Sequence, residues 1–91
     1  MTVPSALPGS SLIEEGLADL ARGVESLAAL VVAVGAPRLR ELGVAVPVTP
    51  ANPEHRLYAL LAASDANAAH SRYNALIRRL VSFERALACG R

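Results

Sequence analysis

The stretch that decides the fold is Asp65–Gly90, DANAAHSRYNALIRRLVSFERALACG, which carries the longest uninterrupted helical pattern in the chain. Its apolar residues recur in alternating steps of three and four positions. These residues are Ala66, Ala69, Tyr73, Leu76, Leu80, Phe83 and Leu87. The spacing is typical of a helix with one buried seam, and not of a β-strand. Asp65 fits the N-cap position and Gly90 the position just after the helix, so we predict a helix between them.

A second seam of the same kind predicts one long helix over Leu12–Val34. Its members are Ile13, Leu17, Leu20, Val24, Leu27, Val31 and Val34. Ser11 and Glu14 have the spacing of a capping box at the start of this helix. Gly16 and Gly23 lie one heptad apart beside the seam. A glycine inside a helix costs about 1 kcal/mol relative to alanine. Either a neighbour crosses closely at these glycines, or they lie on a surface that tolerates them.

The segment between the two seams contains several residues that end helices. Gly35 is expected to end the first helix, and Pro37–Leu42 to form a short second one. Val44–Pro53 contains three prolines, which exclude a regular helix. We predict an extended crossover here, with a brief edge strand over Val44–Val48 as the alternative.

A middle helix follows the crossover, with Asn52 as its N-cap and Pro53 at its first position. Leu57, Leu60 and Leu61 give it an apolar face up to about Ala63. This face does not continue in register into the last helix, so Ser64–Asp65 is expected to be a turn or a kink. The predicted fold is all-α: a small helical bundle of two long helices plus a middle helix and a short connecting helix. We expect a single domain over residues 11–90, preceded by a flexible tail over residues 1–10.

Composition and charge limit the function classes. The chain has 91 residues, 53% of them hydrophobic and 3% aromatic, which predicts one small domain with an aliphatic core. The net charge of +1 does not by itself indicate a nucleic-acid partner. Residues 1–45 carry three Arg and five acids, for −2, whereas residues 46–91 carry six Arg and three acids, for +3. We therefore predict that the acidic first helix lies along the basic last helix.

The end of the first predicted helix, Leu27–Val34, is apolar on every side. A helix of this kind is usually buried on every side. A chain of 91 residues has little material with which to cover it. We therefore predict a subunit or partner interface here, and hence a homo-oligomer or a helical protein partner. The predicted interface residues are Leu27, Leu30, Val31, Val32 and Val34.

Residues that would carry catalytic or metal chemistry are sparse. His55 and His70 lie fifteen positions apart, without the helical or turn spacing of metal ligands. Cys89 is the one cysteine, so neither an internal disulfide nor a CxxC site can form. There is no glycine-rich phosphate loop and no nucleophile elbow. We predict a protein that is not an enzyme and has no catalytic residues, no metal and no cofactor.

Two segments bear on localisation. Met1–Ser10 lacks the basic and apolar regions of a signal peptide. The most apolar run, Leu27–Gly35, has nine residues, about half the length needed to span a bilayer. We expect no membrane span and a cytoplasmic location.

Arginines on the last predicted helix form a basic stripe about two turns long. They are Arg72, Arg78, Arg79 and Arg85. The favoured interpretation is a solvated face that pairs with the acidic first helix. The alternative is a contact with an anion or a nucleic acid through release of counterions. No helix-turn-helix spacing, zinc pattern or set of stacking aromatics supports this alternative.

Three segments resemble the needle subunits of type III secretion systems. They are Gly23-Val24-Glu25-Ser26-Leu27, Pro50-Ala51-Asn52-Pro53 and Tyr73-Asn74. Needle subunits are small helical hairpins with a Pro-x-x-Pro turn, and they polymerise into a hollow filament. The chain differs from them by an insertion over Gly35–Val48, by the absence of Lys and by its end, Cys89-Gly90-Arg91. The resemblance implies self-assembly, and secretion by a route independent of a signal peptide.

These observations favour a non-enzymatic helical protein that acts through helix–helix contacts and assembles with itself. The alternative is a small nucleic-acid-binding or regulatory protein that uses the arginine stripe. A third interpretation, an accessory subunit of a larger enzyme or secretion machine, differs from the first only in the identity of the partner.

Overall fold

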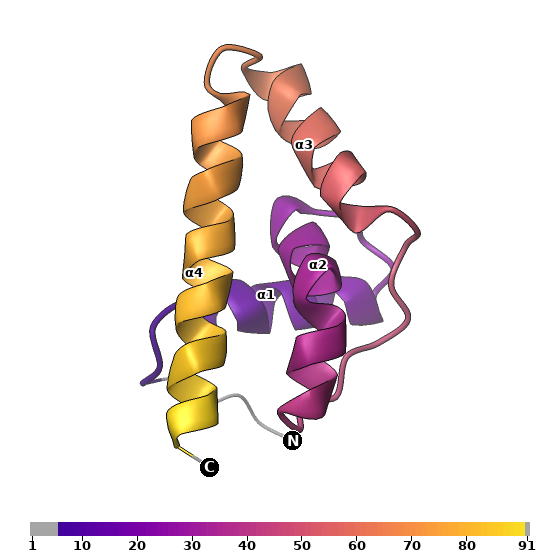
Figure 1. The fold of residues 1–91 in the computed structure, drawn as a ribbon. Helices are drawn as coiled ribbons and strands as arrows, with labels where there is room; N and C mark the ends of the chain where they lie inside the picture. The colour runs from indigo at the N-terminus through magenta and orange to yellow at the C-terminus, as the bar shows by residue number, and fades with distance from the viewer. Residues whose placement is uncertain (1–5, 91) are drawn as a thin grey trace.

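The computed structural model describes residues 6–90, which form four α-helices and contain no β-strand. The helices are α1 (Ser10–Ala21), α2 (Leu27–Glu41), α3 (Pro53–Ser64) and α4 (Ala69–Cys89). α3 and α4 form a hairpin, and α1 crosses behind α2 (Figure 1). The all-α class predicted from the sequence is confirmed. Residues 1–5 of the predicted tail lie outside the described residues, and Ser10 already belongs to α1.

The single helix predicted over Leu12–Val34 is wrong, because the chain turns a corner between α1 and α2. Gly23 has φ +72°, which a continuous α-helix does not allow. The Asp19 carboxylate accepts a hydrogen bond from the Ser26 hydroxyl at 2.6 Å and is paired with the Arg22 guanidinium. The positive φ of Gly23 and the contacts of Asp19 fix a turn here, although the heptad spacing continues through it.

From the buried carboxylate at this corner we expect the stability of the fold to depend on pH. Asp19 is only 6% exposed. The hydrogen bond from Ser26, followed by the bond from Arg22, lowers the pKa of Asp19 below its ordinary value of 3.8. A carboxylate whose pKa is lower in the folded state stabilises the fold above its unfolded pKa. This contribution to stability is lost as the pH falls through the pKa that the carboxylate has in the folded state.

Asp19→Asn should therefore have a lower Tm than the wild type at neutral pH, and the difference should close well below about pH 4. Thermal melts followed by circular dichroism across this range measure the effect. Glu15→Gln, which alters an exposed carboxylate on the same helix, is the control and should follow the wild-type profile. A difference between wild type and Asp19→Asn that is as large in acid as at neutral pH would contradict this role.

α2 continues through two residues that were expected to break it. The predicted helix end at Gly35 and the separate helix over Pro37–Leu42 are both wrong, because α2 runs without interruption to Glu41. A Cβ atom at Gly35 would lie 2.7 Å from Leu80 Cδ1, so the glycine lets α2 and α4 approach closely. Pro37 is exposed, whereas Leu39, two residues further along α2, is buried. Tertiary packing of α2 thus outweighs the cost of a proline inside a helix.

Gly16 marks the crossing of α1 and α2. A Cβ atom here would lie 2.3 Å from the Ala28 carbonyl oxygen and 2.4 Å from Val32 Cγ2. The backbone of α2 therefore occupies the space that a side chain at this position would need. Of the two sequence-based interpretations of the glycine pair, Gly16 fits the close crossing, whereas Gly23 forms the corner and has open space around it.

α2 is the central helix and contacts each of the other three. Leu30 is 1% exposed and Val32 is 0% exposed within the single chain. The chain, expected to have little material for covering Leu27–Val34, buries residues 28–33 of this segment by itself. Val31 is also fully buried, and only Leu27 and Val34 of the predicted interface residues are partly accessible.

The junction between α3 and α4 is a turn rather than a kink. α3 ends at Ser64, and Asp65 Oδ1 accepts hydrogen bonds from the amides of Asn67 and Ala68 at 3.1 and 3.3 Å. Asp65 therefore stabilises this turn and is not the N-cap of α4, which begins at Ala69. The first predicted seam residue, Ala66, lies in the turn and is exposed.

The crossover between α2 and α3 is irregular, so the alternative of an edge strand over Val44–Val48 is not realised. Arg40 fastens the crossover to α2 by donating hydrogen bonds to the carbonyl oxygens of Val46 and Pro47 at 3.2 and 3.0 Å. Asn52 precedes α3 with φ +52°, but its side chain makes no capping hydrogen bond.

Candidate functional site

The side of α3 that faces away from the core is apolar and accessible to solvent. Seven consecutive apolar residues fill Leu57–Ala63. Of these, Leu57 and Leu61 are buried, whereas Tyr58 is 40% and Leu60 41% exposed. We define the α3 outer face as the exposed members of this run. They are Tyr58, Ala59, Leu60 and Ala63.

A groove runs beside the α3 outer face, between α3 and the start of α2. Leu30, Ala59 and Leu60 form most of its apolar lining. At its rim, the Arg56 guanidinium and the Glu25 carboxylate form an ion pair at 3.0 Å. The groove therefore combines an apolar floor with a rim whose charges cancel.

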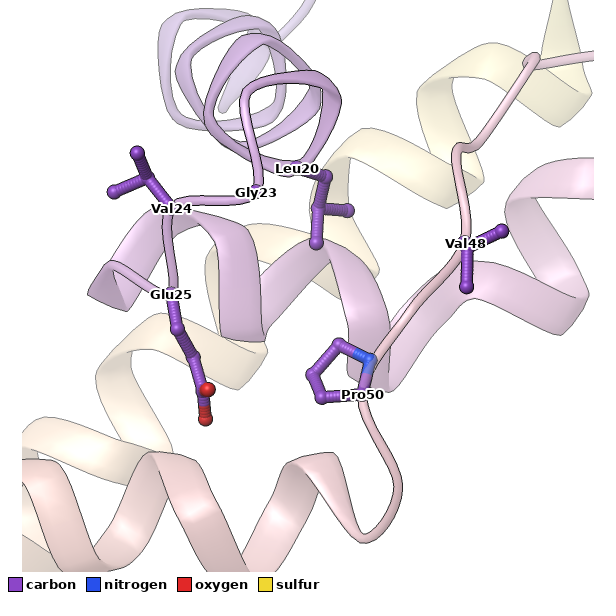
Figure 2. A pocket seen from close by; sticks show the side chains of 6 residues that line it. All are labelled: Leu20, Gly23, Val24, Glu25, Val48 and Pro50. Atoms are coloured by element: carbon purple, nitrogen blue, oxygen red, sulfur yellow. The ribbon is translucent and has the colours of Figure 1, made fainter.

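A second apolar recess adjoins this groove at Glu25, which lines both. Figure 2 shows it between the corner that joins α1 to α2 and the crossover, with Glu25 pointing toward α3. Its apolar lining includes Leu20 and Val24 from the corner and Val48 from the crossover. Val48 is 92% exposed. Val24, a predicted seam residue, is also exposed, because the corner turns it away from the core. The accessible apolar surface thus extends from α3 to the corner.

The predicted pairing of an acidic first helix with the basic last helix is wrong. The ion pairs in the described part of the chain are Arg22–Asp19, Arg38–Glu41 and Arg56–Glu25. α1 runs across α4 rather than along it (Figure 1). A Cβ atom at Gly9, just before α1, would lie 2.9 Å from the Arg79 carbonyl oxygen, so the chain approaches α4 closely at the start of α1.

The basic stripe of α4 is therefore left facing solvent. Its four arginines, Arg72, Arg78, Arg79 and Arg85, are all exposed. Arg72 donates a hydrogen bond to Ser64 Oγ at 3.3 Å, at the surface. The other three side chains have no hydrogen bond or ion pair with any residue from 6 to 90.

Two groups of sequence-predicted residues meet in one place. Leu27, a predicted interface residue on the first turn of α2, lies with Ala75 and Leu76 in a groove against α4. Arg72 and Arg79 line the same groove. We call this the α4 groove. Arg78 and Arg85 do not line it, and Val34 lies in a different recess, near the crossover.

Tyr73, a predicted seam residue, is partly buried and packs against the core. Its ring packs against the ring of Tyr58, with centroids 5.8 Å apart and planes tilted by 54°. Burial, followed by the nearby negative charge of Glu54, raises the pKa of Tyr73. The tyrosine pair therefore joins α3 to α4 near the turn and leaves one side of Tyr58 accessible.

The described part of the chain contains neither a cluster of metal-binding side chains nor a membrane-spanning helix. Across the described range, no group of three His, Cys, Asp or Glu side chains could hold a metal ion. His70 Nε2 instead lies 3.2 Å from Asn74 Nδ2, one turn along α4. No helix within residues 6–90 is both long and apolar enough to cross a membrane.

The α3 outer face was not predicted from the sequence. The signal was present, because Leu57–Ala63 is as uniformly apolar as Leu27–Val34. Comparison of the chain with protein-family models, with curated proteins and with solved structures finds no match.

Proposed function

We propose that the protein acts non-enzymatically through helix–helix contacts, and that it associates with a second copy of itself through the α3 outer face. The observation that carries this proposal is the apolar run Leu57–Ala63, of which the chain buries only one side. A helix that is apolar on all sides usually lies in a core or an interface. Self-assembly is also what the resemblance to needle subunits implies.

Charge supports a second copy as the occupant of this face. Around a two-fold axis the same face of each copy meets the other, so a rim that carried net charge of one sign would be repelled by its copy. Arg56 and Glu25 cancel each other at the rim, 3.0 Å apart, and can also exchange partners across the axis. The chain as a whole carries a formal net charge of +1, which opposes self-association only weakly.

Crosslinking tests whether α3 is the contact. Leu60→Cys in a Cys89→Ser background, treated with a short bis-maleimide, should form a covalent dimer, because α3 of each copy faces α3 of the other. Ser82→Cys in the same background is the matched control, since Ser82 is an exposed helical residue on α4. Its crosslinking should be at least about tenfold slower. Equal rates for the two variants, or no dimer from either, would contradict the proposed contact.

A nucleic-acid-binding function is the second candidate. It is favoured by the four arginines of α4, three of which have no partner within residues 6–90. A protein that binds through such contacts should hold generic DNA or RNA at low salt and release it as salt is added. Arg78→Ala should then weaken binding to all sequences alike. No binding at low salt would exclude this candidate.

A further inference from the structure

The α4 groove presents apolar side chains and two exposed guanidinium groups, of which Arg79 has no partner within residues 6–90 and Arg72 makes one surface hydrogen bond, to Ser64. Its floor contains the side chains of Leu76 and Leu27, each only partly buried, and the exposed methyl group of Ala75. Its lining also includes the exposed guanidinium groups of Arg72 and Arg79. The groove is thus an apolar strip flanked by two positive charges. A partner surface that places apolar side chains between two carboxylates would be complementary to it.

The arginine spacing defines the geometry of that surface. Arg72 and Arg79 are seven residues apart on one continuous helix. Seven residues correspond to two helical turns, or about 10.5 Å. A helix lying along α4 would therefore match both cations with carboxylates that are likewise about two turns apart. Between them, leucine-sized residues at positions three and four apart would meet the apolar floor.

The composition of the groove favours a protein helix over a nucleic acid. A phosphate backbone would meet the two guanidinium groups, but it has nothing to place against Leu27 and Leu76. No aromatic residue lines the groove for base stacking, because Tyr73 packs against Tyr58 between α3 and α4.

We propose that the α4 groove binds an acidic amphipathic helix of another protein. Leu27, Ala75 and Leu76 receive its apolar side, and Arg72 and Arg79 bind its carboxylates. This site lies on α4 and the start of α2, whereas the self-association contact lies on α3, so the two proposals stand or fall separately.

The test uses the full chain and two synthetic helical peptides. The first peptide carries a leucine stripe with a glutamate on each side, the glutamates repeating every two turns. The second has every glutamate replaced by glutamine. Fluorescence anisotropy of the labelled peptides should show that the glutamate peptide binds about tenfold more tightly at low salt, and that added salt removes the difference.

Variants of the protein locate the binding. The double variant Arg72→Gln/Arg79→Gln should weaken binding of the glutamate peptide by about tenfold. Arg78→Gln/Arg85→Gln removes the same charge from α4 outside the groove, and should change binding by less than about twofold. Ala75→Glu should weaken binding of both peptides by blocking the floor, whereas Ser82→Glu, another exposed position on α4, should not.

Several results would overturn the proposal. The peptides could bind equally well, or the two double variants could lose affinity equally, which would indicate attraction to net charge without a site. Single-stranded DNA could bind in a manner that depends on Arg72 and Arg79 while neither peptide binds. That result would assign the groove to nucleic acid.

Discussion

Gly16→Ala should lower the free energy of unfolding by about 2–3 kcal/mol. The added Cβ atom would lie 2.3 Å from the Ala28 carbonyl oxygen, well inside van der Waals contact. Because this oxygen belongs to the backbone of α2, no side-chain rotation relieves the clash, and α1 and α2 must move apart. For a domain of this size, such a loss is a large fraction of the total stability.

Urea unfolding of Gly16→Ala and Gly35→Ala tests this account of the crossing. At Gly35 the nearest atom to an added Cβ is the Leu80 Cδ1 atom at 2.7 Å, the end of a flexible side chain. Alanine is also favoured over glycine inside a helix by about 1 kcal/mol. Gly35→Ala should therefore be close to neutral. A Gly16→Ala protein as stable as the wild type would show that α1 and α2 do not cross as described.

Leu30→Asp and Val32→Asp should unfold the monomer rather than separate an assembly. Both side chains are essentially inaccessible within the single chain. Burying an unpaired carboxylate costs more than about 3 kcal/mol, which few domains of this size can absorb. Far-UV circular dichroism should show loss of helix at neutral pH and no cooperative thermal transition.

Leu60→Glu is the matched control for these buried substitutions, since it also places a carboxylate on an apolar run. Leu60 is 41% exposed, so the variant should keep the helical spectrum. At concentrations where the wild type is a single chain, the Tm of the variant should be close to that of the wild type. A folded, cooperatively melting Leu30→Asp protein would contradict the central position of α2.

The last helix was the element most readily predicted from the sequence. Leu80, Phe83 and Leu87 are buried as their spacing predicts, because α4 keeps one apolar face without interruption. The corner was missed because Val24 and Leu27 maintain heptad spacing across it. The periodicity of apolar residues does not reveal that a glycine has a positive φ, or that a buried carboxylate accepts hydrogen bonds within the turn.

Hydrophobicity alone does not show which apolar segment stays accessible in the folded chain. Leu27–Val34 and Leu57–Ala63 are both apolar on every side. Which of them is covered depends on how the helices pack: α2 contacts all three other helices, whereas α3 packs mainly against α2 and α4. Likewise, the meeting of Leu27 with Arg72 and Arg79 depends on how the start of α2 lies against α4, which neither segment encodes by itself.

The most direct test of the central claim, that a second copy covers the α3 outer face, is molar mass by light scattering after size exclusion. The wild type and Leu60→Glu should be compared over a roughly hundredfold range of concentration. We expect the wild-type mass to rise above the 9.5 kDa of one chain as concentration increases, and Leu60→Glu to remain folded at the mass of one chain. A wild-type mass of one chain throughout, or an equal rise in both proteins, would contradict the claim.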